Sequence, residues 1–492
     1  MGLATRPTNW PAQMKSPLRI AIVGGGITGL AAAHRLQELG GASPAAVSLF
    51  EAGQRLGGVV GTQQFGDYTL ELGPDSFITN KPWAVGLCRR LGIEDRLIPT
   101  DARYRRSLVL RRGRPVAVPE GFQLMTPGRA WPILTSPIFS WWGKLRMGYE
   151  YFIPAKPEVE DESLASFVRR RFGQEALDRL VQPLVGGIYT SDPEKLSLRA
   201  TLPRFLEMER QYGSLIRASR SAAKTADANE QASGARYGLF ATLAGGTQEL
   251  IQALADRVSQ CVQINVSSPV TSLLPFGSGG YRLTVRDQPS QIFDRVILTV
   301  PTYRVADLVQ PFAEHWSQAL RQIEYASTTI VVSGHRLSDV RHPLEAFGLV
   351  IPATEHRRIL AVSFTSRKFP HRAPAGHVQL RTFVGGALQP EYFGISDEDT
   401  KQLVREELRD LLGVRGTPDF EVVARYPRSM PQYHVGHLKR VGRIRELAER
   451  FPGLHLAGSS YDGVGLPDSI HSGEMAAEQA VRDVPQADVP KS

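Results

Sequence analysis

Cysteine is scarce in this sequence, which has only Cys88 and Cys261 among its 492 residues. Two cysteines so far apart exclude a disulfide framework and a four-cysteine zinc site, so we expect a protein of the reducing cytoplasm without a metal centre. Long apolar stretches are lacking as well. No run reaches the roughly 18 residues that a membrane-spanning helix requires, and we therefore predict no such helix.

The charge balance is basic, with 58 Lys and Arg against 49 Asp and Glu, a net charge of +9. This balance is compatible with nucleic acid, an anionic membrane surface or a polyanionic small molecule as partner. No zinc-finger spacing and no RNA-recognition motif accompanies it, so nucleic-acid binding is not expected. The apolar fraction of 42 % is typical of a globular protein, and the length predicts two or three domains.

The first ordered segment predicts a strand, a glycine turn and a helix. The apolar run over 18–23 ends in the motif Gly24-Gly25-Gly26-Ile27-Thr28-Gly29, and a helical pattern follows to residue 39. A second strand over 46–50 ends at Glu51. This is a parallel strand–helix–strand unit with the glycine spacing of a dinucleotide site.

Each glycine of the motif has a separate physical task. Gly24 permits the tight turn, Gly26 allows the backbone to approach a diphosphate, and Gly29 lets the helix lie close to the strand. The free N–H groups of the helix then face the phosphates. Glu51 is placed to accept hydrogen bonds from ribose hydroxyls.

A second glycine pair distinguishes FAD from a nicotinamide cofactor. The sequence after Glu51 is Ala52-Gly53-Gln54-Arg55-Leu56-Gly57-Gly58. Flavoproteins often need such a pair where the chain crosses the pyrophosphate again, and Arg55 can donate to a phosphate. Further along, residues 164–220 show a helical pattern, and residues 325–385 alternate as in an antiparallel sheet.

These motifs resemble those of the oxygen-dependent, FAD-containing porphyrinogen oxidases of haem synthesis, a family within the amine-oxidase-like flavoproteins. The resemblance spans residues 18–483, and its most specific part is the block Pro-Leu-Val-Gly-Gly-Ile-Tyr-Thr-Ser-Asp-Pro. The segments that carry it are 22–30, 51–58, 71–76, 183–193, 212–216, 382–386 and 463–470.

The resemblance implies an α/β fold with a discontinuous Rossmann-like FAD domain of the p-hydroxybenzoate-hydroxylase type. A mixed-sheet substrate domain and a helical, membrane-associating domain would complete it. The implied boundaries are 16–92, 240–302 and 437–485 for the FAD domain, 93–119 and 303–436 for the substrate domain, and 120–225 for the helical domain.

The resemblance also implies the flavin contacts. They come from the two glycine turns, the segment around Pro74, a backbone contact of Val270 and the last glycine motif, whose helix would begin just after Pro467. The implied residues are Gly24, Gly25, Gly26, Ile27, Thr28, Gly29, Glu51, Ala52, Arg55, Gly58, Val59, Gly73, Pro74, Asp75, Ser76, Val270, Val464, Gly465 and Leu466.

For the substrate, the resemblance implies an arginine that anchors a propionate, with Arg106 the first choice and Arg105 the second. Gly187 would face the substrate, Phe383 would stack on a pyrrole ring, and Val350 would contact the macrocycle. Ser363 departs from the aliphatic residue usual in the family, and Ser469 and Ser459 replace a frequent cysteine and asparagine. His471 is the nearest candidate base, but we assign it no role.

The implied reaction removes six electrons from a porphyrinogen, and O₂ takes them up as three H₂O₂. Protoporphyrinogen IX is the first choice of substrate, and coproporphyrinogen III, which bears four propionates instead of two, is the alternative. The arginines between 103 and 114 lean toward the substrate with more carboxylates. Another oxidase or desaturase of the superfamily, and a non-catalytic FAD-fold scaffold, are the remaining alternatives.

The aromatic stretch 122–153 corresponds to the family's membrane-associating region. Trp141 and Trp142 lie there beside Lys144 and Arg146, a combination suited to a membrane interface. We expect peripheral association at most, on the cytoplasmic face of a membrane. A monomer and a homodimer both remain open.

Overall fold

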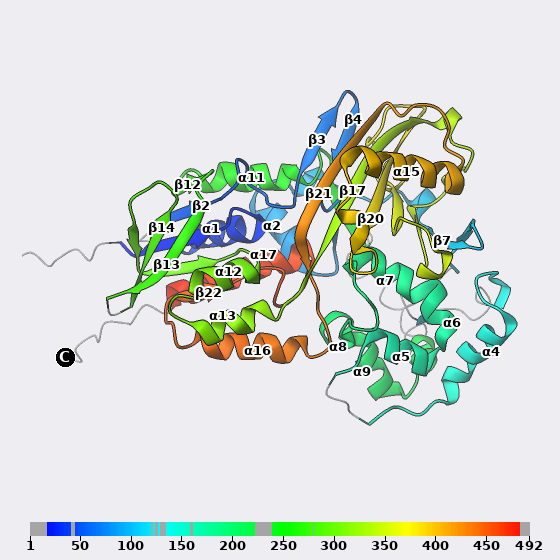
Figure 1. The fold of residues 1–492 in the computed structure, drawn as a ribbon, viewed down its shortest axis with the longest axis horizontal. Coiled ribbons are helices and arrows are strands. Elements are labelled where there is room, and N and C mark those ends of the chain that lie inside the picture. Colours follow the sequence, from blue (N-terminus) through cyan, green and yellow to red (C-terminus); the bar gives the residue numbers. More distant parts are fainter. Residues whose placement is uncertain are drawn as a thin grey trace, which may run out of the picture.

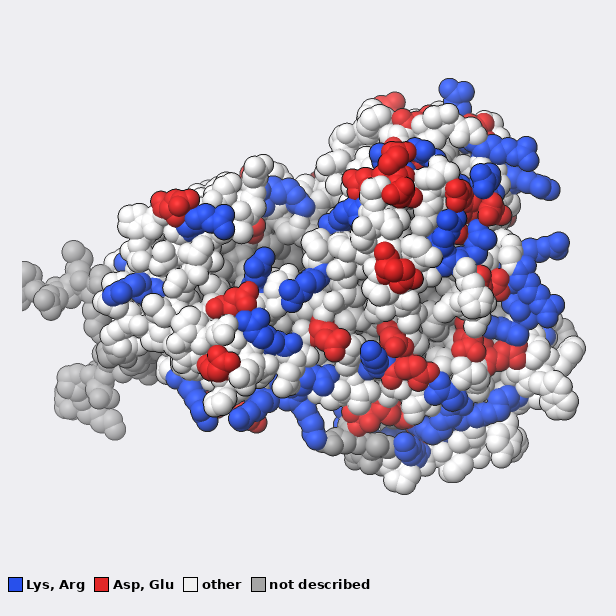
Figure 2. Space-filling model, in the orientation of Figure 1, with Lys and Arg blue, Asp and Glu red and all other residues white. Residues whose placement is uncertain are grey.

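The computed structural model describes residues 17–40, 45–119, 122–123, 126–127, 134–157, 161–221, 239–277 and 279–482. Figure 1 shows three parts: a layered α/β part on the left, a large sheet at the upper right and a group of helices at the lower right. Basic and acidic side chains are interspersed over the face seen in Figure 2, and basic ones also gather along its right-hand edge.

A parallel sheet of five strands forms the middle layer of the left-hand part, in the order β12-β2-β1-β16-β22. Alternate residues of β1 enter different cores: Ile20 and Ile22 pack on one face, and Ala21 and Val23 on the other. The strands are β1 (Arg19–Val23), β2 (Ala46–Phe50), β12 (Val262–Asn265), β16 (Arg295–Leu298) and β22 (Leu454–Leu456). The predicted parallel pairing of the first two strands is confirmed.

Each face of this sheet is covered by a separate layer. The first face carries α1 (Ile27–Leu39), α2 (Pro82–Arg90), α11 (Gln248–Val258) and α17 (Leu466–Arg482). The second face carries the antiparallel sheet of β13 (Val270–Phe276), β14 (Gly280–Val285) and β15 (Gln291–Phe293), together with α12 (Thr302–Val309), α13 (Glu314–Arg321) and α16 (His437–Ala448). Smaller pairings join β3 (Thr62–Phe65) to β4 (Tyr68–Glu71), and β11 (Phe240–Leu243) to β5 (Phe77–Ile78) and β6 (Leu97–Pro99).

The large sheet has seven strands in the order β21-β17-β20-β19-β18-β7-β8. All neighbours are antiparallel except β18 and β7, and the strands predicted within 325–385 are confirmed. The strands are β7 (Ser107–Arg111), β8 (Arg114–Ala117), β17 (Tyr325–Arg336), β18 (Gly348–Val350), β19 (Ala361–Phe364), β20 (His377–Gly385) and β21 (Phe420–Pro431). Its outer face packs on α15 (Asp397–Leu412), and α14 (Thr365–Lys368) follows β19.

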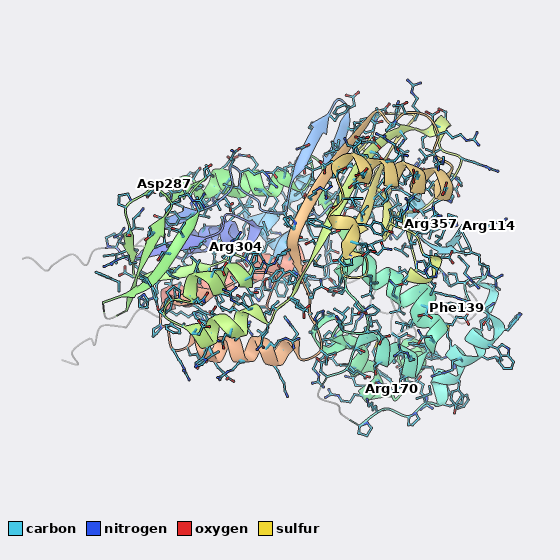
Figure 3. The ribbon with its side chains drawn as sticks, viewed as in Figure 1. Arg114, Phe139, Arg170, Asp287, Arg304 and Arg357 are labelled. Carbon is cyan, nitrogen blue, oxygen red and sulfur yellow. The ribbon has the colours of Figure 1, made fainter. Side chains whose placement is uncertain are left out.

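The helical part is built around a buried ion-pair network. Arg171 is fully buried, pairs with Glu150 and lies 3.3 Å from Glu209. Phe139 and Arg170 mark two places in this part in Figure 3. Its helices are α4 (Trp141–Tyr149), α5 (Leu164–Arg171), α6 (Gln174–Ala176), a π-helical turn (Leu177–Val181), α7 (Gln182–Tyr189), α8 (Leu198–Thr201) and α9 (Pro203–Tyr212).

Short elements complete the fold. The short strands β9 (Phe122–Gln123) and β10 (Thr126–Pro127) pair antiparallel. Residues 124–125 and 128–133 of the predicted aromatic stretch lie outside the described residues. Turns of 3₁₀ helix occur at Glu94–Arg96, Ala102–Tyr104, Glu150–Phe152, Leu337–Asp339, Ala353–Glu355 and Pro390–Phe393. Over the described part of the chain, no helix combines the length and the apolar character needed to cross a membrane.

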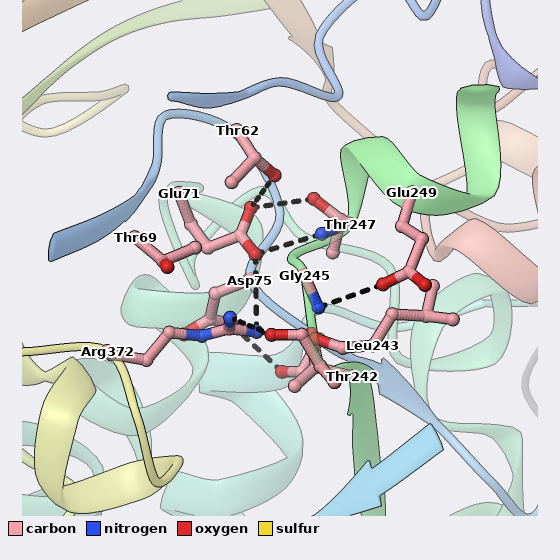
Figure 4. Close-up of polar contacts among 12 residues, drawn as sticks. Thr62, Thr69, Glu71, Asp75, Thr242, Leu243, Gly245, Thr247, Glu249 and Arg372 are labelled. Carbon is pink, nitrogen blue, oxygen red and sulfur yellow. Dashed lines mark hydrogen bonds and ion pairs between the residues drawn. The ribbon is translucent and has the colours of Figure 1, made fainter. Parts of the chain in front are cut away.

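A buried ion pair links the α/β part to the large sheet. Glu71 at the end of β4 and Arg372, in the loop before β20, are both fully buried, and their charged groups lie 3.6 Å apart. Glu71 accepts hydrogen bonds from Thr62 and Thr247, and Arg372 donates to the carbonyls of Leu243 and Ala244 (Figure 4). Burial raises the pKa of the Glu71 carboxyl and lowers that of Arg372, and the opposite charge of the partner counteracts each shift. Each group therefore needs its partner to stay charged.

We predict that replacing Arg372 by Met lowers the free energy of unfolding by about 3–5 kcal/mol, because it leaves the Glu71 carboxylate buried without its counter-charge. Urea unfolding measures this loss. The double variant Glu71→Gln with Arg372→Met should recover part of it. The control is Arg304→Met, which removes an exposed arginine 4.0 Å from Asp307 and should cost less than about 1 kcal/mol. Equal losses for Arg372→Met and the control would contradict the prediction.

Candidate active site

The first glycine turn has the geometry that the sequence motif predicts. Gly24 has φ of 111°, a conformation that favours glycine. A Cβ on Gly29 would lie 1.9 Å from the carbonyl oxygen of Gly24, so no side chain fits there. Gly26 is different, because its Cβ would meet nothing nearer than Gly58 Cα at 4.0 Å. Since Gly26 caps α1 without a side-chain acceptor, the first N–H groups of the helix are available to a ligand.

Glu51 stands at the end of β2, where the motif predicts an acid. Its carboxylate accepts hydrogen bonds of 2.7 Å from the backbone N–H groups of Gly25 and Gly53. These bonds leave further acceptor positions for hydroxyl groups. The chain that leads into Val270 runs alongside, since Ser268 N–H donates to the Glu51 carbonyl at 2.7 Å.

The second glycine pair packs against the first turn. Gly57 N–H donates to the Gly25 carbonyl at 2.8 Å, and Gly57 and Gly58 both have positive φ. The Arg55 guanidinium donates to the carbonyls of Gly58 and Val60 at 2.7 Å and so closes this loop on itself. Its predicted contact with a phosphate stays a prediction. Ala52 and Val59 are exposed on the same loop.

The last glycine motif, around Gly465, lies beside the first glycine turn, although it belongs to the other end of the chain. Leu466 and Ile27, the neighbours of Gly465 and Gly26, line one small space together with Val60. A Cβ on Gly473 would lie 2.2 Å from the Thr28 carbonyl oxygen, so α17 packs directly on α1. Helix α17 begins at Leu466 and includes Pro467, slightly earlier than the sequence predicts.

The first glycine turn, the second glycine pair and the last glycine motif together form a cradle. The segment 73–76 joins this cradle to the large sheet. A Cβ on Gly73 would lie 1.8 Å from the Val59 carbonyl oxygen. Asp75 pairs with Lys368 at 3.0 Å and with Arg381 at 3.2 Å. Burial alone would raise the pKa of the Asp75 carboxyl, but these two cations hold it well below its usual range. Lys368 also donates to Ser76, and the carbonyl of Pro74 accepts a hydrogen bond from Thr247.

Two of the predicted substrate residues, Val350 and Phe383, share one face of the large sheet. The register places Val350 beside Ala361 and Ala361 beside Phe383, so the three side chains form a row across β18, β19 and β20. A Cβ on Gly187, in α7, would lie 3.7 Å from Val350. Ser363 lies on the same face, paired with Gly348 and Arg381.

This inner face lies between the two other parts of the molecule. Towards β20 and β17, Phe383 and Leu72, which precedes Gly73, pack against the same hydrophobic cluster. Towards β18, Val350 and Val464 of the last glycine motif pack against another cluster, which includes Val185 of α7. The row therefore borders two clusters that flavin-motif segments also border.

Other predicted residues lie at the rim or elsewhere. Arg105 and Arg106 are exposed just before β7, where the Arg106 carbonyl accepts from Phe347 N–H at 2.8 Å. His471 stacks on Trp83 with ring centroids 4.1 Å apart. The Ser459 carbonyl accepts from the Tyr433 hydroxyl, which in turn accepts from Gly463 N–H at 2.8 Å, and Ser469 N–H donates within the first turn of α17.

Sequence reasoning missed Lys368, Arg381 and Tyr433. Arg381 is 2 % exposed, and its guanidinium lies 5.4 Å from the Phe383 ring centroid. A charged residue inside an alternating apolar strand was the available signal for Arg381. Lys368 and Tyr433 carry no comparable signal, because their partners are remote in sequence.

Comparisons with known proteins agree with this geometry. The family model for flavin containing amine oxidoreductase matches residues 27–481. Coproporphyrinogen III oxidase of Bacillus subtilis is 34 % identical over 94 % of this chain and 97 % of the relative. Protoporphyrinogen oxidase 2 of Arabidopsis thaliana is 29 % identical over 94 % of each chain. The crystal structure of a putative protoporphyrinogen oxidase from Exiguobacterium sp. 255-15 superposes with a TM-score of 0.85 at 30 % identity, covering 96 % of this chain and 100 % of that one. The chain therefore belongs to the flavin-containing amine oxidoreductase family.

Proposed function

We propose that this flavoenzyme oxidises coproporphyrinogen III to coproporphyrin III with O₂ as electron acceptor. The observation that carries the proposal is the apolar row of Val350, Ala361 and Phe383, whose ends pack against the same hydrophobic clusters as two flavin-motif segments. The row offers a flat tetrapyrrole an apolar surface beside the cofactor. The likeness to the coproporphyrinogen III oxidase of Bacillus subtilis over most of the chain supports the substrate.

The residues of the cradle fit FAD. The open side of Gly26 and Gly58, with the uncapped end of α1, suits a diphosphate, and Glu51 suits a ribose. When bound, FAD accepts electrons from the substrate two at a time and passes them to O₂, so that removing six electrons produces three H₂O₂.

The chain's own residues bind and orient the substrate. Val350 and Phe383 offer apolar contact, and Gly187 allows the macrocycle to approach the backbone of α7. Arg381 and Lys368 hold segment 73–76 in place, at the boundary between cofactor and substrate. His471 is stacked on Trp83 and receives no part in proton transfer.

The sequence makes protoporphyrinogen IX the first choice of substrate, but identity to known relatives favours the alternative, coproporphyrinogen III. The Bacillus subtilis coproporphyrinogen III oxidase is 34 % identical, and the Arabidopsis thaliana protoporphyrinogen oxidase 29 %. Four propionates also match the abundance of arginine around β7, where Arg105, Arg106, Arg111 and Arg112 flank one short strand.

We further propose that the exposed aromatic face of α4 associates peripherally with an anionic membrane. Trp141 and Trp142 are 72 % and 82 % exposed, and Leu145, Tyr149 and Phe152 are exposed nearby. Lys144 lies 4.6 Å from the Trp141 ring centroid, so a cation accompanies the aromatic surface. Aromatic and basic side chains together suit the headgroup region.

The cofactor assignment predicts that Gly26→Val abolishes bound flavin while the fold persists. The backbone of Gly26 is extended, with φ of −71°, and the chain leaves room for a side chain, so the added methyl groups would occupy only the space meant for the diphosphate. Flavin absorbance and the thermal midpoint of the apoprotein measure the outcome. Gly442→Ala, a change in α16 with nothing within 4 Å, is the control and should keep its flavin. A yellow Gly26→Val protein would contradict the assignment.

The substrate assignment predicts a kcat/KM at least about tenfold higher for coproporphyrinogen III than for protoporphyrinogen IX, a difference of about 1.4 kcal/mol in transition-state binding. Porphyrin fluorescence in air gives both rates, and anaerobic bleaching of the flavin confirms that each porphyrinogen reduces it. Equal kcat/KM values for the two substrates would contradict the predicted preference. If neither porphyrinogen bleached the flavin, the proposed function would be wrong.

The membrane proposal predicts that the wild-type protein sediments with anionic vesicles at low salt and that Trp141→Ala with Trp142→Ala lowers the bound fraction severalfold. Burial of indole rings in the headgroup region drives this binding. The control Phe276→Ala removes an exposed aromatic from β13 and should sediment like the wild type. Failure of the wild-type protein to bind vesicles would end the proposal.

A further inference from the structure

A basin of about 600 Å³ opens beside the inner face of the large sheet, away from the flavin motifs. Its charged lining consists of Arg111, Arg112, Glu175, Asp178, Arg179 and Glu355. These residues come from the β7–β8 hairpin, from α6 with the π-helical turn that follows it, and from the 3₁₀ turn at Ala353–Glu355. Figure 2 shows basic side chains along this edge of the molecule, where Figure 3 labels Arg114.

The carboxylates of the basin are already engaged. Glu355 accepts hydrogen bonds from the backbone N–H groups of Arg112 and Gly113, at 2.7 and 2.9 Å. Glu175 accepts from Ser140 and pairs with Arg179, and Asp178 accepts from Gln174 at 2.6 Å. None of these three carboxylates pairs with the side chain of Arg111 or Arg112.

The guanidinium groups of the hairpin are therefore available. Among the residues that the structure describes, neither Arg111 nor Arg112 forms an ion pair, and the Arg111 Nε atom is buried without a hydrogen-bond partner. Burial lowers the pKa of Arg179, and the charges of Arg111 and Arg112 lower it further. The three cations and the three carboxylates of the basin balance formally, but the carboxylates are engaged by other donors. The free guanidinium donors of Arg111 and Arg112 therefore suit binding of an anion.

The position of the basin relates it to the proposed substrate. Arg111 follows Val109 by two residues on β7, and Val109 is paired with Val350. Arg111 therefore lies on the same face of the sheet, one step beyond the apolar row. Arg105 and Arg106 lie at the other end of β7. The five residue steps from Arg106 to Arg111 span about 17 Å, a length comparable to a tetrapyrrole with its carboxyl-bearing arms.

We propose that Arg111 and Arg112, supported by Arg179, bind substrate carboxylates at the edge of the macrocycle opposite to Arg105 and Arg106, and thereby select a porphyrinogen that carries propionates on both edges. The inference rests on the proposed function. Coproporphyrinogen III has a propionate on each of its four rings, whereas protoporphyrinogen IX has propionates on two adjacent rings and vinyl groups on the others. Only the first can place carboxylates at both ends of β7.

The test compares the double variant Arg111→Gln with Arg112→Gln against Arg114→Gln. Arg114 belongs to the same hairpin, is exposed and does not line the basin. We expect the double variant to raise KM for coproporphyrinogen III about tenfold or more, with kcat and flavin absorbance unchanged. KM for protoporphyrinogen IX should change less than about twofold, and the control should match the wild type for both substrates.

A second readout does not require turnover. Quenching of coproporphyrin III fluorescence gives a dissociation constant, which should rise about tenfold in the double variant. If the double variant loses its flavin or has a lower thermal midpoint, Arg112→Gln alone, at an exposed turn position, should still raise both KM and this constant at least about threefold, which is about half of the tenfold effect on a logarithmic scale.

The outcomes separate the inference from the function on which it rests. A wild-type protein that oxidises neither porphyrinogen overturns both. A wild-type protein that oxidises coproporphyrinogen III, with variants that keep its KM, overturns the basin alone. An equal rise of KM for both porphyrinogens also overturns it, because the basin would then not distinguish the second pair of propionates.

Discussion

Contact between backbones at three glycines is the constraint on which the site depends. Gly29 lies against the Gly24 carbonyl, Gly73 against the Val59 carbonyl and Gly473 against the Thr28 carbonyl, each too close for a Cβ. Through these contacts, α1, the loop after β2, segment 73–76 and α17 form one cradle. Any larger residue would separate two of these segments and with them the surfaces that hold the cofactor.

Charge connects that cradle to the surface on which the substrate is proposed to lie. Asp75 stays ionised because Lys368 reaches it from the helix after β19 and Arg381 reaches it from the large sheet. Glu71 and Arg372 make a second buried connection nearby. Buried pairs of this kind contribute little net stability but strongly disfavour separation of the partners. They therefore fix the distance between the two surfaces.

Local patterns carried most of what the sequence could predict. The strand, glycine turn and helix up to residue 39 follow from spacing within one short segment, and the sheet over 325–385 follows from alternation. The pairing of β7 with β18 could not be predicted from such local patterns, because it joins residues about 240 positions apart. Lys368 and Asp75 likewise lie 293 residues apart. The domain boundaries and the individual site residues stay predictions.

The order of strands has a consequence for how the protein is made. The edge strand β22 and the helix α17 are the last elements described, and α17 packs on α1, one of the first. A ribosome releases the chain from its amino end, so the dinucleotide turn emerges long before the partner that closes it. The nascent protein must therefore wait, with an open sheet edge and an incomplete cradle, until α17 has been synthesised before it can take up flavin.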